Sequence, residues 1–254
     1  FVSMIKNLKV EEGEVLVSYD VQALYPSVPQ QEAIEIIEEL MKEDEEVKKK
    51  TTMSVQNFIE LFKMCVRTTY FQFNKKLYKQ VNGLAIGASS SGPAAQLFMV
   101  RLEVRALRSF INPPALWKRY VDDTFAKLLK NEVQAFMEHL NNQHPRIKFT
   151  AEIQNNNKIP FLDTLIHIQP DSAIKTTIYR KPTHTDQYLD FHSNHHHIKQ
   201  KIEISNTFEH RIEELITKEE DKEEERKHMK KALKRCGHPN WVLNRRKKGK
   251  KKVD

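Results

Sequence analysis

The strongest constraint on the fold is the stretch LWKRYVDDTFAKLL at positions 116–129. Residue types favoured in strands flank two adjacent aspartates, Asp122 and Asp123. Adjacent like charges repel, and the repulsion grows as water is removed around them. The pattern predicts a β-hairpin with the two carboxylates at its tip. A lone aspartate in such a place is usually a turn residue or a strand-end cap, but that interpretation is weaker for a neighbouring pair.

The rest of the chain mixes helical and strand patterns. We expect strands at 14–20 and across 147–182, a second hairpin at 68–83, and helices at 31–46, 54–66, 93–107, 132–143 and 198–235. No strand–helix–strand unit repeats, so the order favours an α+β fold with antiparallel pairing.

Particular residues mark the faces and ends of these elements. Ser54 is a candidate N-cap, and Pro93 fits a first helical turn. Pro26 and Pro29 are expected to stop regular structure. The apolar stripe of the first long helix is Ala33, Ile36, Ile37 and Leu40. The charge-rich segment 218–235 is expected to be a solvated helix with i,i+4 ion pairs.

Charge and cysteine content indicate which partners and which cellular location this chain can have. The net charge is +8, but the segment 245–254, which begins RRKKGKKK, carries +6 of it and leaves about +2 for the body. This tail is a linker, a nuclear-localisation patch or a phosphate-binding arm. Two distant cysteines favour a reducing, intracellular location. No apolar run is long enough for a membrane helix, and a start at Phe1 suggests a fragment of something longer.

A third carboxylate completes a candidate site. Asp20 ends the first predicted strand. Neighbouring strands lie about 5 Å apart, so Asp20 and Asp122 can face one spot if the first strand pairs beside the hairpin. Carboxylates gathered in this way suit Mg²⁺. Two such ions can clamp the attacking and leaving oxygens of a phosphoryl transfer.

Four motifs, in order, resemble those of reverse transcriptases. They are SYDVQALYPSVP at 18–29, GLAIGASSSGPAAQLFM at 83–99, YVDD at 120–123, and NNNKIPFLDTLI with IYRKPTHTDQYLDFHSNH at 155–195. The last pair is the most specific and is similar to the Penelope-like retroelement enzymes, which are related to telomerase. The resemblance covers roughly residues 15–243.

The resemblance implies a right-hand polymerase fold. The expected palm spans 1–180, as an antiparallel sheet with packed helices, and includes a fingers-side helical insertion at about 30–82. A mostly helical thumb would follow at 181–244, and 245–254 would be a basic linker or tail. In relatives a fingers segment lies further upstream.

Roles of individual residues follow by the same resemblance. Asp20, Asp122 and Asp123 would be catalytic, and together with the backbone carbonyl of Val21 they would bind two Mg²⁺ ions, with Mn²⁺ as a substitute. Tyr25 would be the sugar gate, and Ile86 and Gly87 would lie at the nucleotide. The remaining positions would contact the nucleic-acid backbone: Arg180, Lys181, His184 and Tyr188.

The implied function is RNA-directed DNA polymerase. Its partners would be an RNA template, a DNA primer and dNTPs, with no membrane, and its location the nucleus. Many members of the family also carry a GIY-YIG endonuclease downstream, so such a domain is a candidate in the full-length protein, although this chain does not show one. The alternatives are an RNA-dependent RNA polymerase, which Tyr25 disfavours, and a truncated or domesticated non-catalytic nucleic-acid-binding module.

Two features depart from the family or compete with it. Many relatives have Met or Gln at the position of Ile86 and Ser-Pro at Ala88–Ser89, which puts fine substrate preference in doubt. Separately, His184, the histidines of HSNHHHIK, Cys236 and His238 form a weak zinc pattern, because their spacing matches no regular zinc motif.

Overall fold

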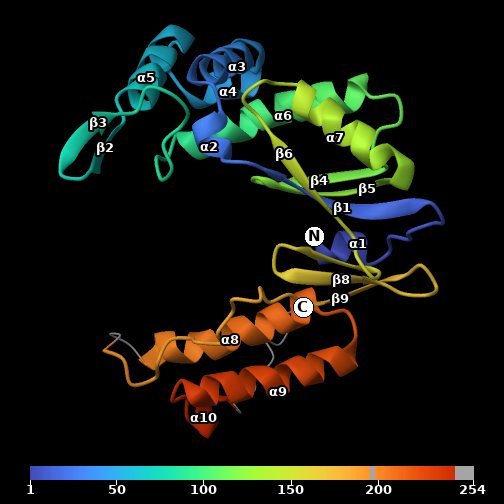
Figure 1. Ribbon diagram of the computed structural model, residues 1–254. Helices are drawn as coiled ribbons and strands as arrows, with labels where there is room; N and C mark the ends of the chain where they lie inside the picture. The colour runs from blue at the N-terminus through green and yellow to red at the C-terminus, as the bar shows by residue number, and fades with distance from the viewer. Residues whose placement is uncertain (195–197, 244–254) are drawn as a thin grey trace. The chain divides into compact units, whose positions relative to one another are not determined.

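The computed structural model describes residues 1–194 and 198–243, which form two compact units (Figure 1). One unit is Glu12–Ile153, and the other joins Phe1–Glu11 to the chain from Gln154 onward. The predicted boundaries of the palm, thumb and tail, at 180 and 244, concern function, and this division into compact units does not test them. They stay predictions. The tail 245–254 lies outside the described residues.

The first unit is built on a four-stranded antiparallel sheet in the order β4-β5-β1-β6. The strands are β1 (Glu14–Val21), β4 (Leu116–Tyr120), β5 (Asp123–Leu129) and β6 (Phe149–Ile153). Alternate residues of β1, such as Val17 and Tyr19, are fully buried in the core. Helices α3 (Gln30–Glu43), α6 (Ser91–Ser109) and α7 (Val133–Asn142) supply most of the other residues of that core and cover this face (Figure 1).

This unit also contains smaller elements, of which α5 (Val55–Arg67) matches a predicted helix. The others are α2 (Leu24–Ser27), α4 (Glu45–Lys50) and the 3₁₀ turn η1 (Lys130–Glu132). Ser54 caps α5 by accepting a hydrogen bond from the backbone N–H of Asn57, and Pro93 lies in the first turn of α6. Both predictions are confirmed.

Two local predictions in this unit are wrong. Pro26 does not stop regular structure, because it lies within the single turn α2, where its missing N–H costs no helical bond. In α3, Leu40 is 40% exposed and Met41 is buried in its place. The stripe there turns by one residue because α3 packs against both α5 and α6.

A separate two-stranded ribbon is formed by β2 (Tyr70–Phe73) and β3 (Lys76–Lys79). Its turn residues Asn74 and Lys75 both have positive φ, as a type I′ hairpin turn requires. The predicted second hairpin is therefore confirmed.

The second unit combines a three-stranded antiparallel sheet with helices. Its elements are α1 (Val2–Ile5), β7 (Lys158–Phe161), β8 (Thr164–Ile168), β9 (Ile174–Ile178), α8 (Ile198–Leu215), α9 (Glu219–Arg235) and α10 (Asn240–Leu243). Thr176 of β9 joins the sheet to the helices, because its hydroxyl donates to the carbonyl of Leu215 and its N–H donates to the Thr217 hydroxyl. Gly237, at φ +78°, follows the end of α9.

The charged segment 218–235 is helical, as predicted, but two of its pairs within α9, Lys222–Glu219 and Arg226–Glu223, are spaced i,i+3 and not i,i+4. Other charges of the segment pair with neighbouring elements. Arg226 of α9 bonds to Glu209 and Glu213 of α8 and to Glu219 and Glu223 of its own helix. Its bonds to Glu209, Glu219 and Glu223 raise its pKa further above the usual range. Lys175 of β9 pairs with Asp221 at 2.8 Å. The charges therefore tie α9 to its neighbours.

The α+β architecture with antiparallel sheets and packed helices is confirmed. None of the helices in the described part of the chain is long and apolar enough to cross a membrane.

Candidate active site

The aspartate pair lies at the tip of the β4–β5 hairpin. Tyr120 pairs with Asp123, so Val121 and Asp122 form a two-residue loop. Val121 has φ +58°, a conformation that is costly for a β-branched side chain. Strained backbone of this kind is concentrated at functional sites. The predicted hairpin with carboxylates at its tip is confirmed.

Strand β1 brings Asp20 to the same place. Asp20 pairs with Asp123 across the β1–β5 ladder, and the N–H of Val21 donates to the carbonyl of Asp122 at 3.2 Å. Burial first, and then the charge of Asp122, raise the pKa of Asp20 above its usual value. The structure therefore brings together the three aspartates that the sequence analysis joined.

The carboxylates lie on the accessible side of the sheet. Because strand side chains alternate, Asp20 faces away from the core that Tyr19 and Val21 enter. Asp20 is exposed, and Asp122 and Asp123 are half-buried. A ligand can therefore reach all three.

The donor set fits Mg²⁺. It consists of carboxylate oxygens, and Mg²⁺ takes one or two protein carboxylates and completes its shell with water and phosphate oxygens. The charge of Asp122 works against ionisation of Asp20, and a cation between them would remove that cost. Within residues 1–194 and 198–243, no three acidic, histidine or cysteine side chains form a ready-made metal cage.

A buried ion pair beneath the hairpin was missed by the sequence analysis. The Nε of Arg119 donates to Glu103 of α6 at 2.8 Å, and the side chains are only 5% and 10% exposed. The indole N–H of Trp117 donates to the same carboxylate oxygen at 2.9 Å. Arg119 also donates to the carbonyl of Val121 at 3.0 Å. This network fixes the strained loop to α6.

One signal in the sequence marks that pair. Glu103 lies among Met99, Leu102 and Ala106, which are buried residues of α6, where a charge is unexpected. Lys, Glu, Arg and Asp are almost never fully buried unless paired.

Two of the predicted nucleotide-binding residues, Ile86 and Gly87, lie in a loop after β3 whose first part is bonded to the backbone of the third, Tyr25. The N–H of Leu84 donates to the carbonyl of Tyr25 at 2.7 Å. Gly83, at φ +71°, packs so closely that an added Cβ would lie 2.4 Å from the carbonyl oxygen of Pro26. Tyr25 packs partly against the core, whereas Ile86 is 78% exposed.

The backbone arrangement therefore places the exposed loop containing Ile86 and Gly87 directly after a segment that is fastened to Tyr25. Gln30 strengthens this fastening by donating to the carbonyl of Gly83 at 2.8 Å. Gly87 has φ +90°, which a residue with a side chain rarely adopts.

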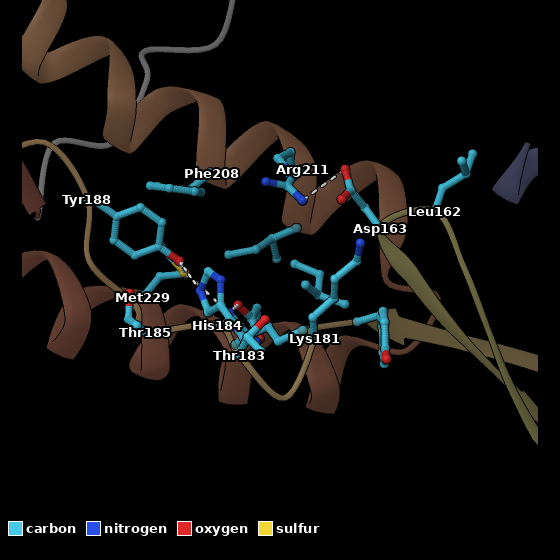
Figure 2. A pocket seen from close by; sticks show the side chains of 15 residues that line it. Leu162, Asp163, Lys181, Thr183, His184, Thr185, Tyr188, Phe208, Arg211 and Met229 are labelled. Atoms are coloured by element: carbon cyan, nitrogen blue, oxygen red, sulfur yellow. Dashed lines mark hydrogen bonds and ion pairs between the residues drawn. The ribbon is translucent and has the colours of Figure 1, made fainter. Parts of the chain in front are cut away.

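The four predicted nucleic-acid contacts lie in the other unit, around a cavity of about 430 Å³ (Figure 2). The Nη1 of Arg180 donates to Glu225 of α9 at 3.0 Å. Burial alone would lower the pKa of Arg180, but its bonds to Glu225 raise it overall. Its guanidinium is thus engaged within the protein, and its role in phosphate contact stays a prediction.

His184 and Tyr188 share a polar network at the same cavity. The His184 ring lies 3.0 Å from Asp186. It also lies 3.2 Å from the Tyr188 hydroxyl (Figure 2). Burial would raise the pKa of Asp186, but His228, Arg180 and His184 together hold it below its usual value.

The zinc pattern is not assembled by the described residues. The Sγ of Cys236 accepts from the N–H of Tyr188 at 3.4 Å, and His238 bonds to the carbonyl of Leu189 at 3.0 Å. Both side chains therefore have structural partners. The histidines at 195–197 lie outside the described residues.

The fold is similar to that of solved telomerase structures. Telomerase from Candida albicans, in complex with a TWJ fragment of telomeric RNA, aligns with a TM-score of 0.59 and 13% identity over 92% of this chain and 40% of that chain. Apo telomerase from Candida tropicalis gives 0.52 and 17% over 82% and 37%. A form of it truncated from the C-terminal domain gives 0.50 and 20% over 70% and 37%. The chain thus shares the telomerase fold and spans about two fifths of those chains.

Sequence comparisons add one partial match. The family described as the animal helix-turn-helix domain matches residues 187–248, which include α8, α9 and α10. No curated protein matches.

Proposed function

We propose that this chain is the palm and thumb portion of an RNA-directed DNA polymerase of the Penelope-like type. The observation that carries the proposal is the meeting of Asp20 and Asp122 at adjacent strand ends, in a fold shared with telomerase. The Penelope-like assignment rests on the motifs NNNKIPFLDTLI and IYRKPTHTDQYLDFHSNH.

Each residue of the site has a distinct role in this proposal. Asp20, Asp122 and the carbonyl of Val21 would hold two Mg²⁺ ions, or Mn²⁺ in their place, with Asp123 in support. Bound there, the ions would neutralise charge on the reacting phosphate and orient the oxygens around it.

The reaction is a nucleotidyl transfer. The 3′-hydroxyl oxygen of a DNA primer bonds to the α-phosphorus of a dNTP, the bond from that phosphorus to the bridging oxygen breaks, and pyrophosphate leaves. The hydroxyl proton passes to solvent. Tyr25 selects deoxyribose, because a ring under the sugar collides with a 2′-hydroxyl. Ile86 and Gly87 lie beside the nucleotide.

Nucleic-acid contacts in the second unit would grip the product. Lys181, His184 and Tyr188 line the cavity of Figure 2, and contacts to phosphate position a duplex without reading its sequence. Arg180 positions the segment through its pairing with Glu225. The template is RNA, and the expected location is the nucleus.

The test is Mg²⁺-dependent primer extension on an RNA template with Asp122→Asn. We expect extension to be abolished in the 254-residue chain or, if the upstream fingers are required, in a version extended at its N-terminus. Asp171→Asn is the matched control, because Asp171 lies in the β8–β9 turn of the other unit, where its carboxylate accepts from the nearby N–H of Ala173. Extension that survives Asp122→Asn would contradict the metal assignment.

A second candidate is a non-catalytic nucleic-acid-binding module. The observation that favours it is the helix-turn-helix match over 187–248, since such motifs often bind DNA. An N-terminally extended chain that binds nucleic acid but never extends a primer would support this candidate over the polymerase.

A further inference from the structure

The β2–β3 ribbon stands apart from the packed core of its unit. All eight of its strand residues are exposed, and no third strand among the described residues pairs with it. An isolated two-stranded ribbon is marginally stable in water. The ribbon nevertheless carries large apolar side chains, with Phe73 63% exposed and Phe71 51% exposed. An exposed apolar surface of this kind indicates a binding site.

The strand register sorts these side chains onto two faces. Phe71 lies opposite Tyr78, and Phe73 lies opposite Lys76. These four residues share one face, which we call the aromatic face, because directly opposed residues point to the same side. The rings of Phe71 and Tyr78 are stacked, with centroids 5.5 Å apart and planes 16° apart. Leu77 and Gln72 lie on the opposite face.

The charge of the ribbon has one sign. No Asp or Glu occurs between Glu60 and Glu103, whereas the ribbon and its turn contain Lys75, Lys76 and Lys79. An aromatic ring beside a lysine ammonium group can bind a nucleotide, because the base stacks on the ring and the anionic phosphate pairs with the ammonium group. Leu61 and Met64 of α5 are also exposed, which makes a protein partner the competing occupant, but the unbalanced positive charge favours a polyanion.

We propose that the aromatic face of the β2–β3 ribbon binds single-stranded nucleic acid, with bases stacked on Phe73 and on the Phe71–Tyr78 pair and a phosphate on Lys76. Stacking does not depend on base identity, because every base has a flat π-face. The contact is therefore independent of sequence. It goes beyond the proposed function, because it requires neither the aspartates nor a nucleotide substrate.

The first experiment measures binding of labelled single strands of about 12 nucleotides by fluorescence anisotropy, within the usual range of site sizes. Phe73→Ala in the 254-residue chain is expected to weaken binding by about 5- to 150-fold, the cost of losing one stacked base. Phe73→Leu should weaken it similarly, because leucine keeps apolar area but has no π-face. Phe73→Trp should preserve it.

Matched controls distinguish base stacking from non-specific binding to exposed apolar side chains. Leu77→Ala removes an equally exposed apolar side chain from the opposite face and should leave affinity unchanged. Lys76→Gln should lower the slope of log K against log salt by about 0.7, the value for one neutralised phosphate on a single strand. All three positions are exposed, and thermal unfolding of each variant checks that the fold is kept.

Equal effects of Phe73→Ala and Leu77→Ala, or no effect of either, would overturn the proposal. Full affinity in Phe73→Leu would also overturn it, because the contact would then depend on apolar area and not on a π-face. The outcome is separable from that of the proposed function. A version extended at its N-terminus that never extends a primer but binds single strands through Phe73 would contradict the polymerase proposal and support this one.

Discussion

Removing Glu103 is expected to destabilise the unit that carries the hairpin. Its carboxylate accepts hydrogen bonds from Arg119 and Trp117 at 2.8 and 2.9 Å. The Arg119 side chain is 5% exposed, so Glu103→Ala leaves a positive charge buried with no carboxylate partner. Breaking a buried ion pair from one side costs about 3–5 kcal/mol.

That cost converts directly into a denaturation shift. With a urea slope of about 2 kcal/mol per M, the midpoint should fall by roughly 1.5–2.5 M. Trp117 reports on the site itself, because its indole donates to Glu103. A Trp241→Phe background removes the other tryptophan, which is 55% exposed and lies in α10 of the second unit. The fluorescence then follows the hairpin alone.

A double-mutant cycle tests the physical reason. Arg119→Met should cost about as much as Glu103→Leu, because each leaves one buried charge unpaired. The double variant should be more stable than either single variant, since replacing both members of a buried pair by apolar groups is often nearly neutral. If the single variants shift the free energy of unfolding by less than about 0.5 kcal/mol, as ordinary surface substitutions do, the reasoning fails.

Three further predictions concern selectivity, charge and pH. Tyr25→Ala should raise ribonucleotide incorporation in primer extension, since the ring excludes the 2′-hydroxyl; an unchanged ratio of dNTP to rNTP use would remove the gate. Deleting 245–254 should flatten the salt dependence of nucleic-acid binding by about 0.7–0.9 for each phosphate that the tail neutralises, whereas an unchanged slope would leave the tail as a linker or localisation signal. The pKa of Asp186 is lowered in the folded protein, so its carboxylate stabilises the fold above the unfolded value of about 3.9 and that stability disappears as pH falls through the lower folded pKa. The thermal stability of the wild type relative to Asp186→Asn, whose partners are Arg180, His184 and His228, should therefore be greatest above pH 5 and shrink toward pH 2; an advantage that grows on acidification would refute this sign.

Local structure was largely predictable because it depends on neighbours in the chain. The stripe of α5 with its Ser54 cap, the Asn74–Lys75 turn and the hairpin around Asp122 each follow from a few adjacent residues. The candidate site was predicted too, because two adjacent aspartates in a strand pattern are unusual and a third ends the strand that pairs beside them.

The charged residues show where prediction from sequence stopped. The sequence does not show which carboxylate pairs with each of three arginines that lie in charged or aromatic runs: Arg119, Arg180 and Arg226. Their partners are decided by packing between distant segments: Glu103 lies on α6, Glu225 on α9 and Glu209 on α8.

The sequence alone determined the longer elements, their order and the identity of the three aspartates. Only the tertiary structure decided which charges are buried together, how the strained Val121 loop is tied to α6, and that the β2–β3 ribbon keeps its aromatic face exposed. The physical reason is that helix and turn patterns depend on short-range sterics and hydrogen bonding. Ion pairing and exposure depend instead on which segments, far apart in the chain, exclude water from each other.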